Sequence, residues 1–371
     1  MSEPLARSPQ RRGISHLVRP VVLTVMLAGL FALLHPLPAQ AHIAGAGGSP
    51  TDNRATVTSL RPATSAVEVT VGIGGQWVRV TDRGAGQIVV LGKQGEPFLQ
   101  LAGNRVQVNE RSRTAAESGL VPRAAPAGNP ATGVTWVPRS DGDQVSWADP
   151  RITAAPGRGE SASWELPLIV DGQRVGVLGT TERIPPSSPW AWVAALVLMV
   201  TAVSALGWVR NWRRTMAAVV TAGVLAFVAH LVGTGFAPQE NGAVFAWVGI
   251  AAVGGFALLI GAVAVQSTLR GKAAAPERVV MAGIMVLILA ATDITVLWNS
   301  QLPFGGPPAL DRVLTVLTYA AALGMLVAGL RLVGRQRQAG AEAVESGADA
   351  PETSAPGTSE SEALAPGAVS R

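Results

Sequence analysis

Residues 190–209 read WAWVAALVLMVTAVSALGWV, and this stretch decides the architecture of the chain. It carries no charge and has the length of roughly 20 residues that a helix needs to cross a bilayer. Pro185, Pro186 and Pro189 come just before it and interrupt regular structure. The stretch therefore predicts a first transmembrane helix, joined to the preceding residues by a stiff neck.

Further apolar stretches of similar length follow along the chain. They predict five spans in an α-helical transmembrane bundle, at residues 190–209, 216–236, 243–265, 279–298 and 314–333. Basic residues gather beside the ends of these spans on one side, at Arg210, Arg213, Arg214, Arg270, Lys272, Arg278, Arg331, Arg335 and Arg337. The opposite loops contain Arg312 alone. Because basic loops stay in the cytoplasm, the residues before the first span should lie outside the cell.

The amino terminus has the layout of a secretory signal peptide over residues 1–41. Four arginines come first, the apolar run 21–34 follows, and Ala39-Gln40-Ala41 offers a small-residue cleavage site. An uncleaved anchor is the alternative, but the run is short for a span and two prolines follow it. Cleavage would make His42 the first residue of the mature chain.

Residues 42–186 predict an extracytoplasmic all-β domain, a small Ig-like sandwich. Short runs rich in Val, Ile, Thr and Trp alternate with turn residues, and candidate strands lie at 55–60, 67–73, 77–81, 88–91, 98–101, 106–109, 164–170 and 174–180. Asp171-Gly172 is a hairpin signal. Gly72 to Trp77 could pass for a phosphate loop, but it lacks a following helix and favours a hairpin turn.

The composition limits the chemistry. The chain has no cysteine, which excludes thiolate metal sites and thiol nucleophiles. Only His42 and His230 remain after cleavage, so a Ser-His-Asp hydrolase is not expected, and we predict a protein that is not an enzyme. Basic residues are dispersed, which argues against nucleic-acid binding. Residues 338–371, rich in Ala, Gly, Ser, Thr and Glu, predict a disordered cytoplasmic tail.

Two ionisable residues fall inside predicted spans. His230 and Asp293 should lie at a similar depth in the outer part of the bilayer, where they could meet. Such residues are costly in lipid and are functional hypotheses, here a polar site in a small transporter. The alternative is that Asp293 reaches the interface and His230 bonds a neighbour in its own helix.

Small residues recur at four-residue spacing in two spans. Ala320, Gly324 and Ala328 form one stripe, and Ala257 with Gly261 forms another. This spacing allows helices to approach closely, either within the bundle or in a homo-oligomer.

A mature chain beginning at His42 would have a special chemistry. The free α-amine and imidazole of an amino-terminal histidine offer two nitrogens to one Cu(II) ion. Asp52, Glu96 or water would have to complete the site, because the predicted exported domain has no other histidine. Copper handling is thus an alternative function, and chance occurrence of histidine after the cleavage site is the competing explanation.

Several short segments resemble one group of proteins. They are the start at residues 42–51, reading HIAGAGGSPT, with residues 89–99, 109–112 and 300–304. Together they are similar to uncharacterised exported multi-pass membrane proteins of actinobacteria. The resemblance implies the architecture and no activity. Histidines that such relatives carry near residues 146–151 are missing here, which argues against a metal role for that segment.

The predicted function is a multi-pass cell-membrane protein whose external β domain is a non-enzymatic binding or assembly module. Its expected partners are the lipid bilayer and a protein outside the cytoplasm.

Overall fold

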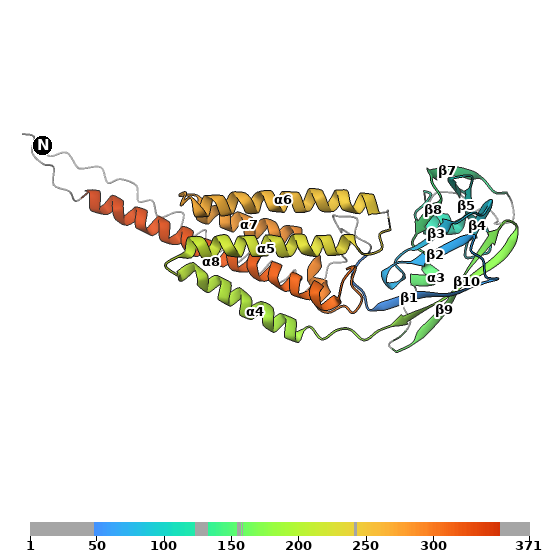
Figure 1. The fold of residues 1–371 in the computed structure, drawn as a ribbon, viewed down its shortest axis with the longest axis horizontal. Helices are drawn as coiled ribbons and strands as arrows, with labels where there is room; N and C mark the ends of the chain where they lie inside the picture. Colours follow the sequence, from blue (N-terminus) through green and yellow to red (C-terminus); the bar gives the residue numbers. More distant parts are fainter. Residues whose placement is uncertain (1–47, 123–132, 154–156, 158, 241–242, 349–371) are drawn as a thin grey trace, which may run out of the picture.

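The computed structural model describes residues 48–122, 133–153, 157, 159–240 and 243–348, with side chains as far as Glu342 in the last helix. A β region comes first and a helical bundle follows it, placed end to end (Figure 1). The predicted signal peptide, His42 and residues 349–371 of the predicted tail lie outside the described residues.

The β region contains two antiparallel sheets. The larger has seven strands, in the order β1 (Asn53–Arg61), β10 (Gln173–Arg183), β9 (Ser161–Val170), β4 (Gln87–Leu91), β5 (Pro97–Ala102), β6 (Arg105–Asn109) and β7 (Trp136–Asp141). The smaller has three, in the order β2 (Val67–Val71), β3 (Val78–Asp82) and β8 (Gln144–Trp147). Short helical turns lie between strands, at η1 (Ile73–Gly75), α2 (Arg113–Glu117) and α3 (Pro150–Thr153).

Alternating side chains build one core between the two sheets. In β2 the side chains of Val67 and Val69 are buried while Glu68 points to solvent, as the period of two requires. Phe98 of the larger sheet packs edge-to-face on Trp147 of the smaller, with ring centroids 5.6 Å apart. The prediction of an antiparallel β region is confirmed. The Ig-like arrangement is not, since an Ig constant domain divides its strands four and three.

Both predicted hairpins form. Asp171 and Gly172 adopt positive φ angles of 49° and 80°, as a two-residue turn between β9 and β10 requires. The stretch from Gly72 to Trp77 joins β2 to β3, with the Gly72 amide donating to the Trp77 carbonyl at 2.8 Å. It is therefore a turn and not a phosphate loop.

The bundle consists of apolar helices of different lengths. They are α4 (Trp190–Ala205), extended by η2 (Leu206–Trp208), α5 (Trp212–Gly235), α6 (Ala243–Leu269), α7 (Ala275–Leu289), η3 (Asp293–Leu297) and α8 (Pro308–Ala348). Four segments within them are long and apolar enough to cross a membrane: 190–208, 212–235, 243–269 and 308–342. The helix α8 packs against α4, α5 and α7, while α6 lies on α5. Large apolar side chains face outward, as lipid contact requires; Leu198, Val244 and Phe245 are exposed.

The fourth expected helix, residues 279–298, is broken. The helix α7 starts earlier and ends at Leu289, and the shorter η3 begins at Asp293. The Ala290 carbonyl accepts hydrogen bonds from the Asp293 amide, at 2.9 Å, and from the Tyr319 hydroxyl of α8, so the α-helical pattern stops there. At 15 residues, α7 is shorter than a membrane helix needs.

The predicted tail begins as helix. Instead of becoming disordered at residue 338, α8 continues to Ala348. The segment 335–345 is rich in Ala, Glu, Gln and Arg, which all have high helix propensity, and the span that precedes it has already nucleated the helix.

The stripes of small residues serve packing inside one chain. A Cβ atom at Gly324 of α8 would overlap Val203 of α4, and one at Gly261 of α6 would lie 2.9 Å from Val224 of α5. Close approach of helices within the bundle accounts for both stripes.

Candidate functional site

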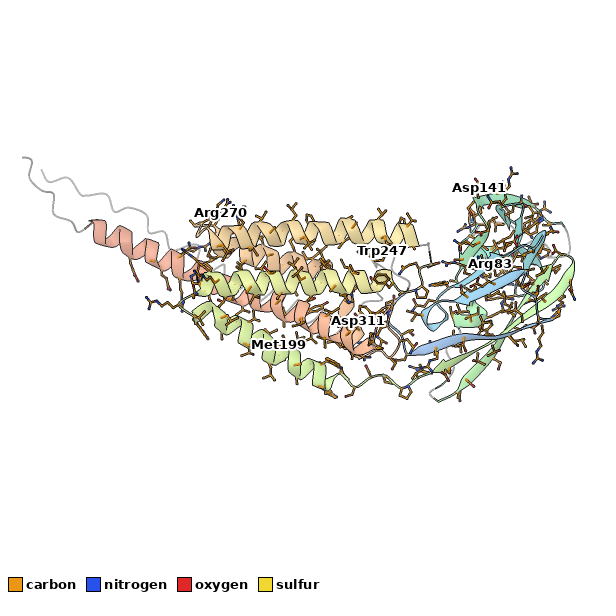
Figure 2. All side chains as sticks on the ribbon, viewed as in Figure 1. Arg83, Asp141, Met199, Trp247, Arg270 and Asp311 are labelled. Atoms are coloured by element: carbon orange, nitrogen blue, oxygen red, sulfur yellow. The ribbon has the colours of Figure 1, made fainter. Side chains whose placement is uncertain are left out.

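The helix α5 places a buried histidine near the end of the bundle that faces the β region. His230 is 4% exposed, and its surroundings on α5 are apolar. Its ring is contacted by residues of η3, after the break in α7, and of the first turn of α8. Figure 2 shows Asp311, at the start of α8, at this end of the bundle.

Two carboxylates hold opposite edges of the His230 ring. The Nδ1 atom lies 2.6 Å from Oδ1 of Asp311, and the Nε2 atom lies 3.4 Å from Oδ2 of Asp293. The structure thus brings together the two residues that the sequence singled out, and adds a third. When the ring is protonated, both nitrogens are donors and each faces an acceptor. We call His230, Asp293 and Asp311 the charged triad.

Asp311 was not among the residues predicted from the sequence, because it lies just before the predicted span 314–333 and outside its apolar stretch. A signal was present: Asp311, Thr315 and Tyr319 recur every four residues and therefore share one face of a helix. All three are buried in the structure, at 1%, 2% and 4% exposure. A polar stripe at helical spacing inside an apolar segment predicts buried partners.

An aromatic side chain packs against the histidine of the triad. The Phe304 ring stacks on the His230 ring, with centroids 6.3 Å apart and planes inclined by 19°. Phe304 can approach because Gly233 lies beneath it, where any Cβ atom would overlap the ring. The Gly305 amide also donates to the Gly233 carbonyl at 2.9 Å. The loop after η3 is thereby fixed over the triad.

The His230 ring fits a proton-holding or charge-pairing role better than that of a metal ligand, because both of its nitrogens face carboxylates. The two carboxylates lie on opposite edges of the ring, so they do not converge on one point with a free ring nitrogen. Within the part of the chain that the structure describes, no group of three or more His, Cys, Asp or Glu side chains is arranged to hold a metal ion. Buried ionisable groups in a membrane bundle usually pair with one another and are typical of proton pathways.

The loop after η3 also forms hydrogen bonds with the β region. Thr51 and Gln301 form an antiparallel bridge in which each amide donates to the other carbonyl, at 3.0 and 2.8 Å. The Ser300 amide donates to the Asp52 side chain at 2.9 Å. The neck residue Ser187 donates its amide to the Trp298 carbonyl at 3.1 Å. Residues 298–304 therefore connect the β region to the triad.

A second contact joins β3 to the loop after α5. Arg79 donates to the carbonyl of Gln239 and, at 2.9 Å, to that of Glu240. Its guanidinium also lies 5.1 Å from the centre of the Trp77 ring, a cation–π distance. Burial lowers the pKa of Arg79, although the nearby Glu240 charge acts in the opposite direction. The contact anchors the smaller sheet on the bundle.

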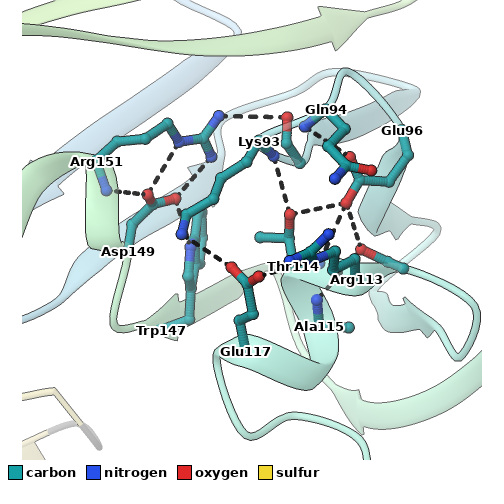
Figure 3. Close-up of polar contacts among 12 residues, drawn as sticks. Lys93, Gln94, Glu96, Arg113, Thr114, Ala115, Glu117, Trp147, Asp149 and Arg151 are labelled. Carbon is teal, nitrogen blue, oxygen red and sulfur yellow. Dashed lines mark hydrogen bonds and ion pairs between the residues drawn. The ribbon is translucent and has the colours of Figure 1, made fainter. Parts of the chain in front are cut away.

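The polar clusters inside the β region are structural (Figure 3). Asp149 is buried beneath Arg151, with a closest distance of 2.7 Å, and accepts from the Trp147 indole at 3.1 Å. Burial raises the pKa of Asp149, but the Arg151 interactions and the indole outweigh it and leave the pKa lowered. Arg151 also donates to the Leu91 carbonyl at 3.2 Å. Segment 146–151 thus connects β8 of the smaller sheet to β4 of the larger sheet through hydrogen bonds.

Glu96 is the second such cluster. Its carboxylate accepts from the Thr114 hydroxyl at 2.7 Å and from the Ser112 hydroxyl at 3.0 Å, at the beginning of α2. Burial acts to raise the pKa of Glu96, but these hydrogen bonds and those from backbone amides outweigh it and lower the pKa. Its Oε1 atom thus serves α2, and its Oε2 atom accepts from the Gln94 amide at 3.0 Å, so both oxygens of Glu96 are engaged within the β region.

Of the predicted site residues, His230 and Asp293 are described and in contact, whereas His42 lies outside the described residues. No protein-family model matches this chain, and no curated protein or solved structure is significantly similar to it. The resemblance to exported actinobacterial membrane proteins stays a prediction.

Proposed function

We propose that this multi-pass membrane protein is a binding or assembly module that presents its β region outside the cell in a fixed orientation. The observation that carries the proposal is the docking of the β region on the bundle through three separate contacts. These are the Thr51–Gln301 bridge, the neck at Ser187, and Arg79 on the loop after α5.

The fixed docking supports the proposal that the bundle holds the β region in one orientation towards a partner, and does not merely tether it to the membrane. A flexible linker would allow a binding domain to sample orientations, whereas backbone hydrogen bonds at the bridge and the neck hold one orientation. The edge strand β7 lies at the top of the β region in Figure 1, at the opposite edge of the larger sheet from β1, and its last residues, Pro138 to Asp141, are exposed. This part of the domain is therefore open to a partner.

The charge distribution supports the proposed orientation. The end of the bundle away from the β region carries Arg270, Arg213 and Arg335, among other basic residues, and Figure 2 shows Arg270 there. Basic loops remain on the cytoplasmic side of the membrane, which leaves the β region outside.

The orientation is tested with single cysteines, because the natural chain contains none. Cysteine at Ser140 in β7 should react with a membrane-impermeant maleimide in intact cells. Cysteine at Gln338 in the cytoplasmic end of α8 should react only after permeabilisation. The reverse pattern would overturn the proposed topology.

The binding role is tested by photo-cross-linking in intact cells. A photoreactive residue at Ser140, on the exposed strand β7, should give a discrete protein adduct. The same residue at Leu198, which faces outward on α4, is the control and should label lipid or nothing specific. Adducts of equal pattern from both positions would argue against recognition by the β region.

A small transporter is the second candidate, and the charged triad is the observation that favours it. His230 is held between Asp293 and Asp311 beside a broken helix, an arrangement found in proton and ion pathways. Replacing His230 and Asp293 with alanine separates the two candidates. An unchanged cell phenotype with normal accumulation in the membrane would eliminate the transporter.

A further inference from the structure

The polar stripe of α8 contains two buried oxygen atoms without partners. Tyr319 donates to the Ala290 carbonyl, and one oxygen of Asp311 faces His230. The other oxygen of Asp311, Oδ2, and the hydroxyl of Thr315 have no hydrogen-bond partner among the described residues. A buried polar atom without a partner is costly, so each such case in a native structure requires an explanation.

Thr315 differs from the other threonines of the bundle. Threonine in a membrane helix usually donates to a carbonyl in the preceding turn of its own helix. Thr318 does so, to Leu314 at 2.8 Å, and so do Thr201, Thr221 and Thr268. Of the threonines described in α4 to α8, only Thr315 leaves its hydroxyl unpaired in a buried position. Its oxygen is therefore free to bind something other than the helix.

The charges of the triad also do not balance. With His230 protonated, two carboxylates face one positive charge, which leaves one negative charge on a site where the His230 and Asp311 side chains are buried and that of Asp293 is 18% exposed. The nearest arginine on α8, Arg312, is directed elsewhere: it donates to the carbonyls of Val296 and Asn299 at 3.2 and 2.8 Å. An unbalanced buried charge is unfavourable, and one bound cation would neutralise it.

The break between α7 and η3 provides a suitable environment for such a cation. Unwound backbone at the end of a helix exposes carbonyl oxygens, and membrane proteins use such carbonyls to coordinate Na⁺. The Tyr319 hydroxyl fixes one end of this break to the same face of α8 that carries Thr315. Hard cations prefer oxygen ligands, which is the donor set that this face presents.

We propose that Asp311 Oδ2 and Thr315 Oγ1 form part of a site for one alkali-metal ion at the break between α7 and η3. The ion balances the charged triad, and water or backbone carbonyls complete its coordination. The site is independent of what the β region binds.

The test is direct binding of ²²Na⁺ to the purified full chain in detergent, together with its thermal unfolding midpoint. Midpoints are compared in NaCl, KCl and N-methyl-D-glucamine chloride at one ionic strength and pH. A bound ion stabilises the folded state by RT ln(1 + [ion]/Kd), so the midpoint should keep rising with the logarithm of the Na⁺ or K⁺ concentration above Kd, while ²²Na⁺ binding saturates. It should not rise with the organic cation.

Matched variants locate the site. Thr315→Val preserves the shape of the side chain and removes the oxygen, and it should weaken ion binding about tenfold, the effect of one lost polar contact. Thr318→Val removes a hydroxyl one turn away that is bonded to its own helix, and should bind like the natural chain. Thr315→Ser keeps the oxygen and should retain binding, and a cooperative unfolding transition of Thr315→Val in N-methyl-D-glucamine chloride shows that its loss of binding is not misfolding.

Three results would overturn the proposal. The first is equal midpoints in Na⁺, K⁺ and the organic cation. The second is equal ion binding by Thr315→Val and Thr318→Val. The third is a midpoint that responds to pH but to no alkali-metal ion, because a proton would then balance the charge.

Discussion

His230 Nδ1 lies 2.6 Å from Asp311 Oδ1, although 81 residues separate them in the chain. This pair ties α5 to α8 inside the bundle, and the weaker contact to Asp293 adds η3. The loop that follows η3 forms a β-bridge to the β region through Gln301 and a ring contact with His230 through Phe304. The buried charges and the docking of the β region thus share one structural element.

Removing one partner of the buried pair should be strongly destabilising. Asp311→Ala leaves His230 without its closest acceptor, and breaking a buried ion pair costs about 3–5 kcal/mol. Asp293→Ala should cost less, since its side chain is 18% exposed and its oxygen lies 3.4 Å from the ring. Unfolding titrations in mixed micelles measure both. Equal effects of the two variants would contradict the asymmetry of the triad.

The fit of Phe304 over Gly233 predicts a compensating pair of mutations. Gly233→Ala places a methyl group in the position of the Phe304 ring, and overpacking of this kind costs about 1–3 kcal/mol. Phe304→Ala in the same chain removes the clash. The double variant should therefore lose less stability than the sum of the two single variants in unfolding titrations. Strict additivity would show that the ring does not lie there.

The Asp149–Arg151 pair predicts acid sensitivity of the β region. The folded pKa of Asp149 is below its ordinary value of 3.8, so the carboxylate stabilises the fold above that pH. This contribution is lost as the pH falls below 3.8 towards the folded pKa. Fluorescence of the full chain, including Trp147 beside Asp149, follows the change. Asp149→Asn should be less stable at neutral pH and should lack this part of the acid dependence.

The copper alternative depends on the mature amino terminus. If the chain begins at His42, the purified protein should bind one Cu(II) ion with a nitrogen-rich paramagnetic resonance spectrum. One residue added before His42, or His42→Ala, should abolish that spectrum. Amino-terminal sequencing comes first, because any other first residue removes the ligand set.

The sequence predicted the β region well because its signals are local. Alternation at Val67 and Val69 and the turn at Asp171-Gly172 depend on near neighbours. The break after Leu289 was not predictable in this way, because Ala290 and Ala291 favour helix. The hydroxyl that donates to the Ala290 carbonyl comes from Tyr319, which lies on another helix. Asp311 was missed for a related reason. It lies before the apolar stretch 314–333, and its partner His230 lies on another helix.

The β region is docked on the bundle at Thr51 and Gln301, and we propose that it lies outside the cell. Residues of a hydrogen-bonded antiparallel pair have Cα atoms about 5.5 Å apart, a distance that suits a disulfide. Thr51→Cys with Gln301→Cys introduces the only two cysteines of the chain.

Disulfides form outside the cytoplasm and rarely within it. In cells, the double variant should therefore form an intramolecular disulfide without added oxidant, seen as two thiols protected from maleimide until reduction. Ser140→Cys with Gln301→Cys, which places one thiol on the distant strand β7, should leave both thiols reactive. Two free thiols at positions 51 and 301 in the folded, membrane-inserted protein would contradict the account.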